Sequence, residues 1–94
     1  MAVTEKMSQG SQSALNLSAN TVIKAAPGRL TRVSVTTAGA AGAVYDTFGV
    51  GGAIPANLIA VVPAVVGVYL FDWPCNIGIV YIPGAAQVAS ISYE

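Results

Sequence analysis

The sequence predicts a small all-β protein, a β-sandwich or jelly-roll-like barrel of seven to eight short strands with an extended N-terminal arm. Three observations predict this class. Short apolar runs rich in Val and Ile are separated by Pro, Gly and Asn, which is typical of strands and turns. No helical periodicity continues for more than about one turn. The 94 residues allow only one domain, and this many strands in that length indicate a sandwich or small barrel.

The N-terminal half predicts a polar arm followed by four strands. Residues 1–13 are expected to form the arm, and residues 14–94 the single domain. The expected strands are Ser13–Leu17, Thr21–Ala25, Arg29–Thr37 and Ala43–Phe48. Between the second and third, Pro27 and Gly28 predict a tight turn, with Gly28 at positive φ. We therefore expect residues 21–37 to form a hairpin.

Alternation along the third strand predicts which side chains share a face. One expected face holds Thr31, Val33 and Val35. The other, mostly polar, holds Leu30, Arg32, Ser34 and Thr36.

The C-terminal half predicts a glycine-rich loop over residues 48–56 and four more strands. These are Asn57–Val62, Val66–Trp73, Ile77–Ile82 and Val88–Tyr93. In residues 66–73 and 77–82 both alternating faces are apolar, although a two-layer sandwich covers only one face of each sheet. The second face must therefore be covered by the chain's own loops and arm, or by a neighbouring subunit.

The composition also indicates apolar surface outside the core. Hydrophobic residues make up 54% of the chain and charged residues 9%, against about 25% charged in ordinary soluble domains. Four basic and four acidic residues cannot coat the surface of a domain of this size. The remaining apolar surface is expected to meet another protein or a lipid bilayer.

A membrane span is the less favoured of these two destinations. No charged residue lies between Asp46 and Asp72, and such a window is long enough for a transmembrane helix. However, four glycines, two prolines and Asn57 interrupt the window, and glycine and proline both disfavour a helix interior. A pair of buried strands fits this window better, and a small membrane-inserted protein is kept as a third hypothesis.

The sequence lacks the residues of most enzyme and metal sites. It has no histidine and one cysteine, so we expect no catalytic triad, no intrachain disulfide, no metal site and no cofactor. The net charge is zero without a basic stripe, which argues against a nucleic-acid partner. Asp46 and Asp72 are interpreted as solvated strand-end carboxylates, and Cys75 as a small buried thiol. The polar N-terminus lacks a signal or transit peptide pattern, so we expect a reducing compartment.

Five residues are candidates for a partner interface: Arg29, Arg32, Tyr69, Phe71 and Trp73. The two arginines lie on one strand, where they either form ion pairs across an interface or keep that strand soluble. The three aromatic residues either belong to the core or anchor an intersubunit surface. The residue pattern leaves both alternatives open.

Two stretches carry a resemblance to a known class of protein. They are NLSANTVIKAAPGRLTRVSV followed by AGAAGAVYD, and LIAVVPAVVGVYLFDWPCNIGIVYIPGAAQVASISY. Their order of strands and turns over residues 14–93 resembles small β-sandwich capsid decoration or cement proteins of tailed bacteriophages. The resemblance implies a non-enzymatic virion structural protein on the outer capsid surface. It also implies binding to the major capsid protein, self-association as a homotrimer or homodimer, and assembly in the host cytoplasm.

A second hypothesis is a β-module of a head fibre, spike or tail that binds a host-surface glycan. In that case the aromatic residues, with Asp46 or Asp72, would contact the sugar. The resemblance also implies that residues 1–13 reach along a capsid subunit and that a strand is added to a neighbour's sheet.

Overall fold

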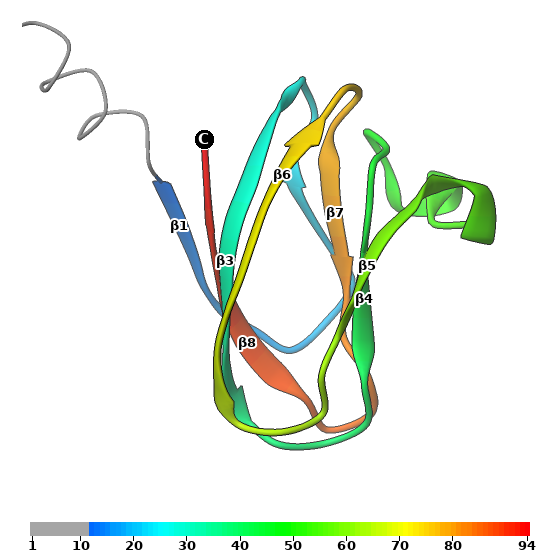
Figure 1. Cartoon of the computed structure of the whole chain (residues 1–94). Helices are drawn as coiled ribbons and strands as arrows, with labels where there is room; N and C mark the ends of the chain where they lie inside the picture. The colour runs from blue at the N-terminus through cyan, green and yellow to red at the C-terminus, as the bar shows by residue number, and fades with distance from the viewer. Residues whose placement is uncertain (1–11) are drawn as a thin grey trace, which may run out of the picture.

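The structure, a computed structural model, describes residues 12–94 as eight strands and two short 3-10 turns (Figure 1). The strands are β1 (Gln12–Leu17), β2 (Thr21–Lys24), β3 (Gly28–Thr37), β4 (Gly42–Tyr45), β5 (Leu58–Val62), β6 (Gly67–Cys75), β7 (Ile79–Ile82) and β8 (Val88–Tyr93). The turns are η1 (Val50–Gly52) and η2 (Pro55–Asn57). η1 lies within the predicted loop of residues 48–56, and η2 extends one residue beyond it. Gln12 and Ser13 belong to β1, and the rest of the predicted arm lies outside the described residues.

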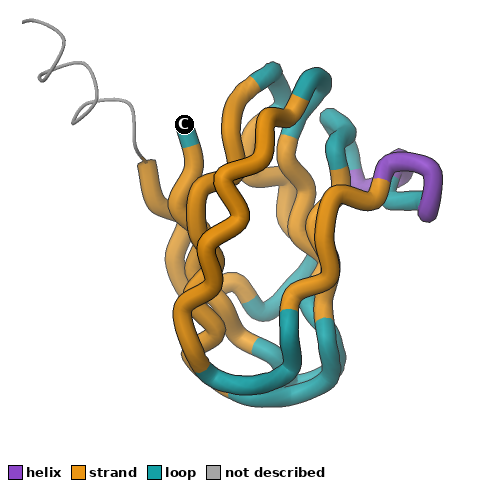
Figure 2. Tube along the Cα trace, in the orientation of Figure 1, coloured by secondary structure: helices purple, strands orange, loops and turns teal. Residues whose placement is uncertain are grey.

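The strands form two antiparallel sheets of four strands each (Figures 1 and 2). Sheet A has the order β1-β8-β3-β6, and sheet B has the order β2-β7-β4-β5. The pairs β1–β8, β2–β7, β3–β6 and β4–β5 are nested, as though one long hairpin had been rolled up. This is the arrangement of an eight-stranded jelly roll, so the predicted fold class is confirmed.

The core lies between the two sheets and is made mostly of branched aliphatic side chains, with one tyrosine. Its fully buried members include Leu30, Val33 and Ile91 from sheet A, and Val44 and Tyr81 from sheet B. Alternate residues of each strand supply these side chains, as the period of a strand requires. The opposite residues therefore form two outer faces, and these faces are where partners can bind.

The predicted hairpin over residues 21–37 is wrong. β2 pairs with β7 in sheet B, whereas β3 pairs with β6 and β8 in sheet A. The turn between β2 and β3 therefore crosses from one sheet to the other. Gly28 has no positive φ; it is required because a Cβ there would collide with the carbonyl oxygen of Glu94.

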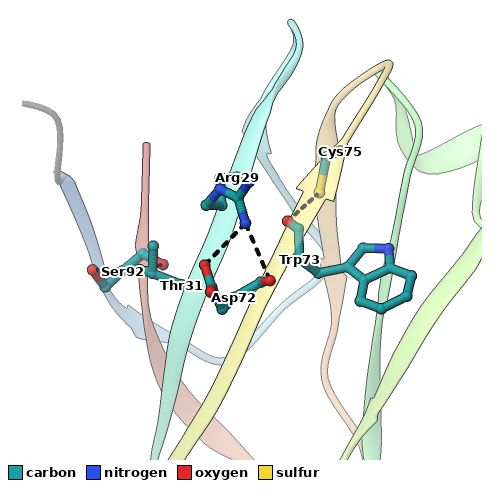
Figure 3. Close-up of polar contacts among 6 residues, drawn as sticks. All are labelled: Arg29, Thr31, Asp72, Trp73, Cys75 and Ser92. Carbon is teal, nitrogen blue, oxygen red and sulfur yellow. Dashed lines mark hydrogen bonds and ion pairs between the residues drawn. The ribbon is translucent and has the colours of Figure 1, made fainter.

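The predicted faces of the third strand are wrong at one end. The register of β3 shifts against both β6 and β8 between Leu30 and Arg32, which moves Leu30 to the inner face. Leu30 is fully buried beside Val33, while Arg32 is exposed on the outer face. The Thr31 hydroxyl at this irregularity donates to the carbonyl oxygen of Ser92 at 2.6 Å and contacts its hydroxyl at 2.9 Å (Figure 3).

One end of the sandwich is held together by a buried glutamine. Gln87 Oε1 accepts hydrogen bonds from the Tyr81 hydroxyl at 2.5 Å and the Gly84 N–H at 3.3 Å. Its Nε2 donates to the carbonyl oxygen of Pro63 at 2.9 Å. Gln87 is 1% exposed, and no buried side-chain polar atom in residues 12–94 lacks a partner. Gln87 thus joins the loop between β5 and β6 to the loop between β7 and β8.

Candidate interaction surfaces

The outer face of sheet B is apolar across all four strands. One row, given by the strand register, is Val22, Val80, Tyr45 and Leu58. The next row is Ile82, Ala43 and Val61. None of these side chains is charged, and Val80 is fully buried although it lies outside the core cluster. The second apolar face predicted for the residue 77–82 strand is therefore present, and no other strand of the described chain packs over it.

The loop between β4 and β5 extends this face. It projects from sheet B on the side away from sheet A (Figures 1 and 2). Phe48, Val50 and Ile54 lie on this loop, and all three are exposed. We use the term apolar face for the two rows on sheet B together with these three loop residues.

The outer face of sheet A has a different chemical character. It carries a shallow groove of about 170 Å³. The groove is lined by Ser13, Leu15, Arg32, Ser34, Val68, Ser90, Ile91 and Ser92. Serines from β1, β3 and β8 form much of this lining, with Leu15 and Val68 as apolar walls. The Arg32 guanidinium makes no hydrogen bond or ion pair with any residue of 12–94, so among these residues nothing compensates its charge.

Arg29 and Arg32 have different environments. The Arg29 guanidinium donates to the Asp72 carboxylate at 3.0 Å and to the Asp72 carbonyl oxygen at 3.2 Å (Figure 3). Both side chains are partly exposed, and such pairs contribute only about 0–1 kcal/mol to stability. Arg29 therefore neutralises Asp72, whereas Arg32 has no acidic partner among residues 12–94.

The three predicted aromatic residues do not form one exposed surface. Tyr69 and Phe71 pack against the core from β6, and the Tyr69 hydroxyl donates to the carbonyl oxygen of Val65 at 2.7 Å. Trp73 is about half exposed, and its indole points away from Arg29 and Asp72 (Figure 3). Of the two alternatives, Tyr69 and Phe71 therefore fit a role in the core. Trp73 remains the exposed candidate for a partner interface.

Asp46 has a structural role at the end opposite Gln87. Its carboxylate accepts hydrogen bonds from the backbone N–H groups of Asn76, Ile77 and Gly78 at 2.8 to 3.1 Å. Burial by itself raises the pKa of Asp46, but these three hydrogen bonds outweigh it and hold the pKa below its usual value of 3.8. Asp46 is thus a strand-end carboxylate, as the sequence indicates, and it also binds the backbone of residues 76–78.

We expect the Asp46→Asn substitution to lower the free energy of unfolding at pH 7 by about 1–2 kcal/mol, because hydrogen bonds to a charged acceptor are lost. A lowered pKa means that the unfolded state takes up the proton first. This stabilisation is therefore present above about pH 4 and is lost as the pH falls through the folded-state pKa. Urea titrations at pH 7, 5 and 3 should show the difference shrinking, and a difference that is constant with pH would contradict the assignment.

Cys75 is a buried free thiol, as predicted. Burial raises its pKa, and the nearby Asp46 carboxylate raises it further. Its Sγ contacts the carbonyl oxygen of Trp73 at 3.7 Å (Figure 3). A neutral buried thiol is a poor nucleophile, so Cys75 is not a candidate for chemistry.

Within residues 12–94, no group of three or more His, Cys, Asp and Glu side chains is placed to hold a metal ion. The same residues contain no helix with the length and apolar character needed to cross a membrane. Comparison of the chain with protein-family models, curated proteins and solved structures finds no match. The surfaces themselves must therefore indicate the function.

Sequence reasoning missed the larger part of the apolar face. Ala43–Tyr45 and Leu58–Val62 contain no polar side chain except the Tyr45 hydroxyl, so neither alternating set of residues can form a solvated face. That signal was available, because half-exposed strands normally alternate apolar with polar residues. Recognising the face also required the register that aligns β2, β7, β4 and β5.

Proposed function

We propose that this chain is a virion structural protein, a decoration or cement protein that binds the outer surface of a phage capsid and stabilises the head. The sequence resembles such proteins over residues 14–93. The jelly roll supports the proposal, since this fold occurs in viral capsid proteins, although it also occurs in lectins. Fold alone does not determine function, so the argument depends on the surfaces.

The observation that carries the proposal is the apolar face. It crosses all four strands of sheet B and contains no charged side chain. Permanent protein interfaces are more hydrophobic than ordinary surface and bury side chains of this kind. A protein that always sits in a lattice can present such a face to a fixed neighbour.

The proposed partner is the major capsid protein, with self-association as a second contact. Repeated copies on a shell would multiply weak individual contacts through avidity. An apolar, uncharged face is unsuited to nucleic acid, whose phosphates are bound by clustered Lys and Arg. The proposed role is mechanical, without catalysis or cofactor.

The test is to add the purified chain to capsid shells assembled from the major capsid protein of the same phage. We expect the chain to co-sediment with the shells, to add density to their outer surface, and to raise the temperature at which they disassemble. Failure to bind shells, in any assembly state, would contradict the proposal.

Glycan binding has less support from the described residues. Asp46 is bound to three backbone N–H groups, Asp72 is paired with Arg29, and Tyr69 and Phe71 face the core. A glycan-array screen separates the two functions, because a decoration protein should give no hits. A strong, specific hit together with no shell binding would favour the fibre or spike alternative.

A further inference from the structure

Within residues 12–94, the free edge of β6 is the least protected strand edge. β6 ends sheet A, and over its nine residues it is the longest of the four edge strands. Its N-terminal part, residues 67–71, has no charged or proline residue. Free edges are usually guarded by charge, proline or shortness, because their unpaired backbone groups accept another strand.

The other three edges are less suitable for pairing. β2 has four residues, β5 has five, and β1 changes register between Ala14 and Leu17 with Asn16 at positive φ. β6 has a comparable irregularity at Phe71 and Asp72, where Asp72 also has positive φ, but it leaves residues 67–70 regular. A partner for this regular segment must be an extended strand, because only a strand supplies matching N–H and C=O groups.

We propose that the strand paired with β6 is β6 of a second copy, related by a two-fold axis near Tyr69. This antiparallel pairing places Val68 opposite Leu70 of the second copy on the outer face. Val68 and Leu70 are 68% and 71% exposed in the single chain, the two highest values among the large hydrophobic side chains within β6. On the inner face the two Tyr69 residues would lie opposite each other, and each Tyr69 ring already lies over Gly67 of its own chain.

The charges are compatible with this pairing. The only charged residue in β6 is Asp72, and Arg29 of the same chain neutralises it. Arg32 lies beside Leu70 on β3, so the two copies' arginines would be separated by about three strand spacings, roughly 14 Å. Charges at that distance are largely screened at physiological salt. The pairing would therefore join sheet A of the two copies into one eight-stranded sheet without charge repulsion. Each half of that sheet would carry one serine-lined groove.

The seam involves few residues, so the dimer should be weak. Interfaces well below about 1,200 Å² are typical of transient complexes. We expect sedimentation equilibrium between 10 μM and 1 mM to show a reversible monomer–dimer equilibrium. This inference rests on the proposed function, because it specifies the self-association included there. The assay contains no capsid shells, so dimerisation and capsid binding can fail independently.

The main test compares two matched substitutions. Leu70→Lys should weaken dimerisation at least tenfold, because two lysines would enter the seam. Leu15→Lys is the control: Leu15 is 70% exposed on the outer face of the same sheet, at the opposite edge. It should leave dimerisation unchanged. A wild-type chain that is monomeric at 1 mM, or equal effects of the two substitutions, would overturn the proposal.

A cysteine experiment tests the register. Mixing the Val68→Cys and Leu70→Cys variants under mild oxidation should give a disulfide-linked heterodimer faster than either variant gives a homodimer. Directly opposed residues place their Cα atoms about 4.5–5.5 Å apart, which suits a disulfide, and Cys75 is buried. Equal rates in the mixture and in the separate variants would reject the proposed axis.

Discussion

Replacing Gln87 with leucine is expected to lower the free energy of unfolding by about 3 kcal/mol, the largest effect predicted for a single side chain here. The substitution leaves the Tyr81 hydroxyl, the Gly84 N–H and the Pro63 carbonyl without their buried partner. Each unsatisfied buried group costs about 1–3 kcal/mol, and local rearrangement recovers part of the sum. In a domain of this size the melting temperature should fall by roughly 12–24 °C, measurable by differential scanning calorimetry.

The control for this prediction is Tyr81→Phe. That variant removes one hydrogen bond, but Gln87 Oε1 keeps the Gly84 N–H and Nε2 keeps the Pro63 carbonyl. Its cost should be about 1 kcal/mol. Burial raises the pKa of Tyr81 to about 12, so the wild type should lose stability between about pH 10 and 12, and the variant should lose less. If Gln87→Leu were no worse than Tyr81→Phe, the glutamine would not hold the loops together.

Introducing a lysine into the apolar face is expected to weaken shell binding by at least 100-fold. Val61 is 57% exposed on β5, within the uncharged apolar face, so Val61→Lys should leave the monomer folded. In a complex, however, the ammonium group would be desolvated without a partner, which costs several kcal/mol. Co-sedimentation with shells over a range of protein concentrations measures the change.

The matched control is Val65→Lys. Val65 is 67% exposed in the loop between β5 and β6, outside the apolar face. The change in side chain is identical, so nonspecific effects of added charge are shared. We expect Val65→Lys to bind shells within about threefold of the wild type. If the two variants bind equally well, a different surface meets the capsid.

The positions of the strands could be predicted from local sequence, but their partners could not. Runs such as Val88–Tyr93 are bounded by turn residues, and this signal depends only on neighbours along the chain. The Pro27-Gly28 turn predicts a hairpin, because such a turn usually joins adjacent strands. The partner of β2 is instead β7, more than fifty residues away.

For the candidate surfaces, the sequence predicted their existence but not their position. The shortage of charge indicated that some apolar surface would remain uncovered, but not where it would lie. Tyr69 and Phe71 are interface candidates in the sequence because aromatic residues often anchor interfaces. Alternation along β6 instead places both side chains against the core. Arg29 and Arg32 are indistinguishable in the sequence. Only the structure, with Asp72 within 3.0 Å of Arg29, separates a compensated charge from one that has no acidic partner among residues 12–94.

The nested strand pairing has a consequence for how the protein is made. β1 pairs with β8, and Gln12 lies in register with Tyr93, so the first strand has no partner until the last has been synthesised. Such sequence-distant pairing gives a high contact order and slow folding, in milliseconds to seconds. On the ribosome, the core side chains of strands β2 to β6 emerge before β7 and β8 can complete the two sheets. The nascent chain should therefore depend on chaperones until β8 leaves the exit tunnel.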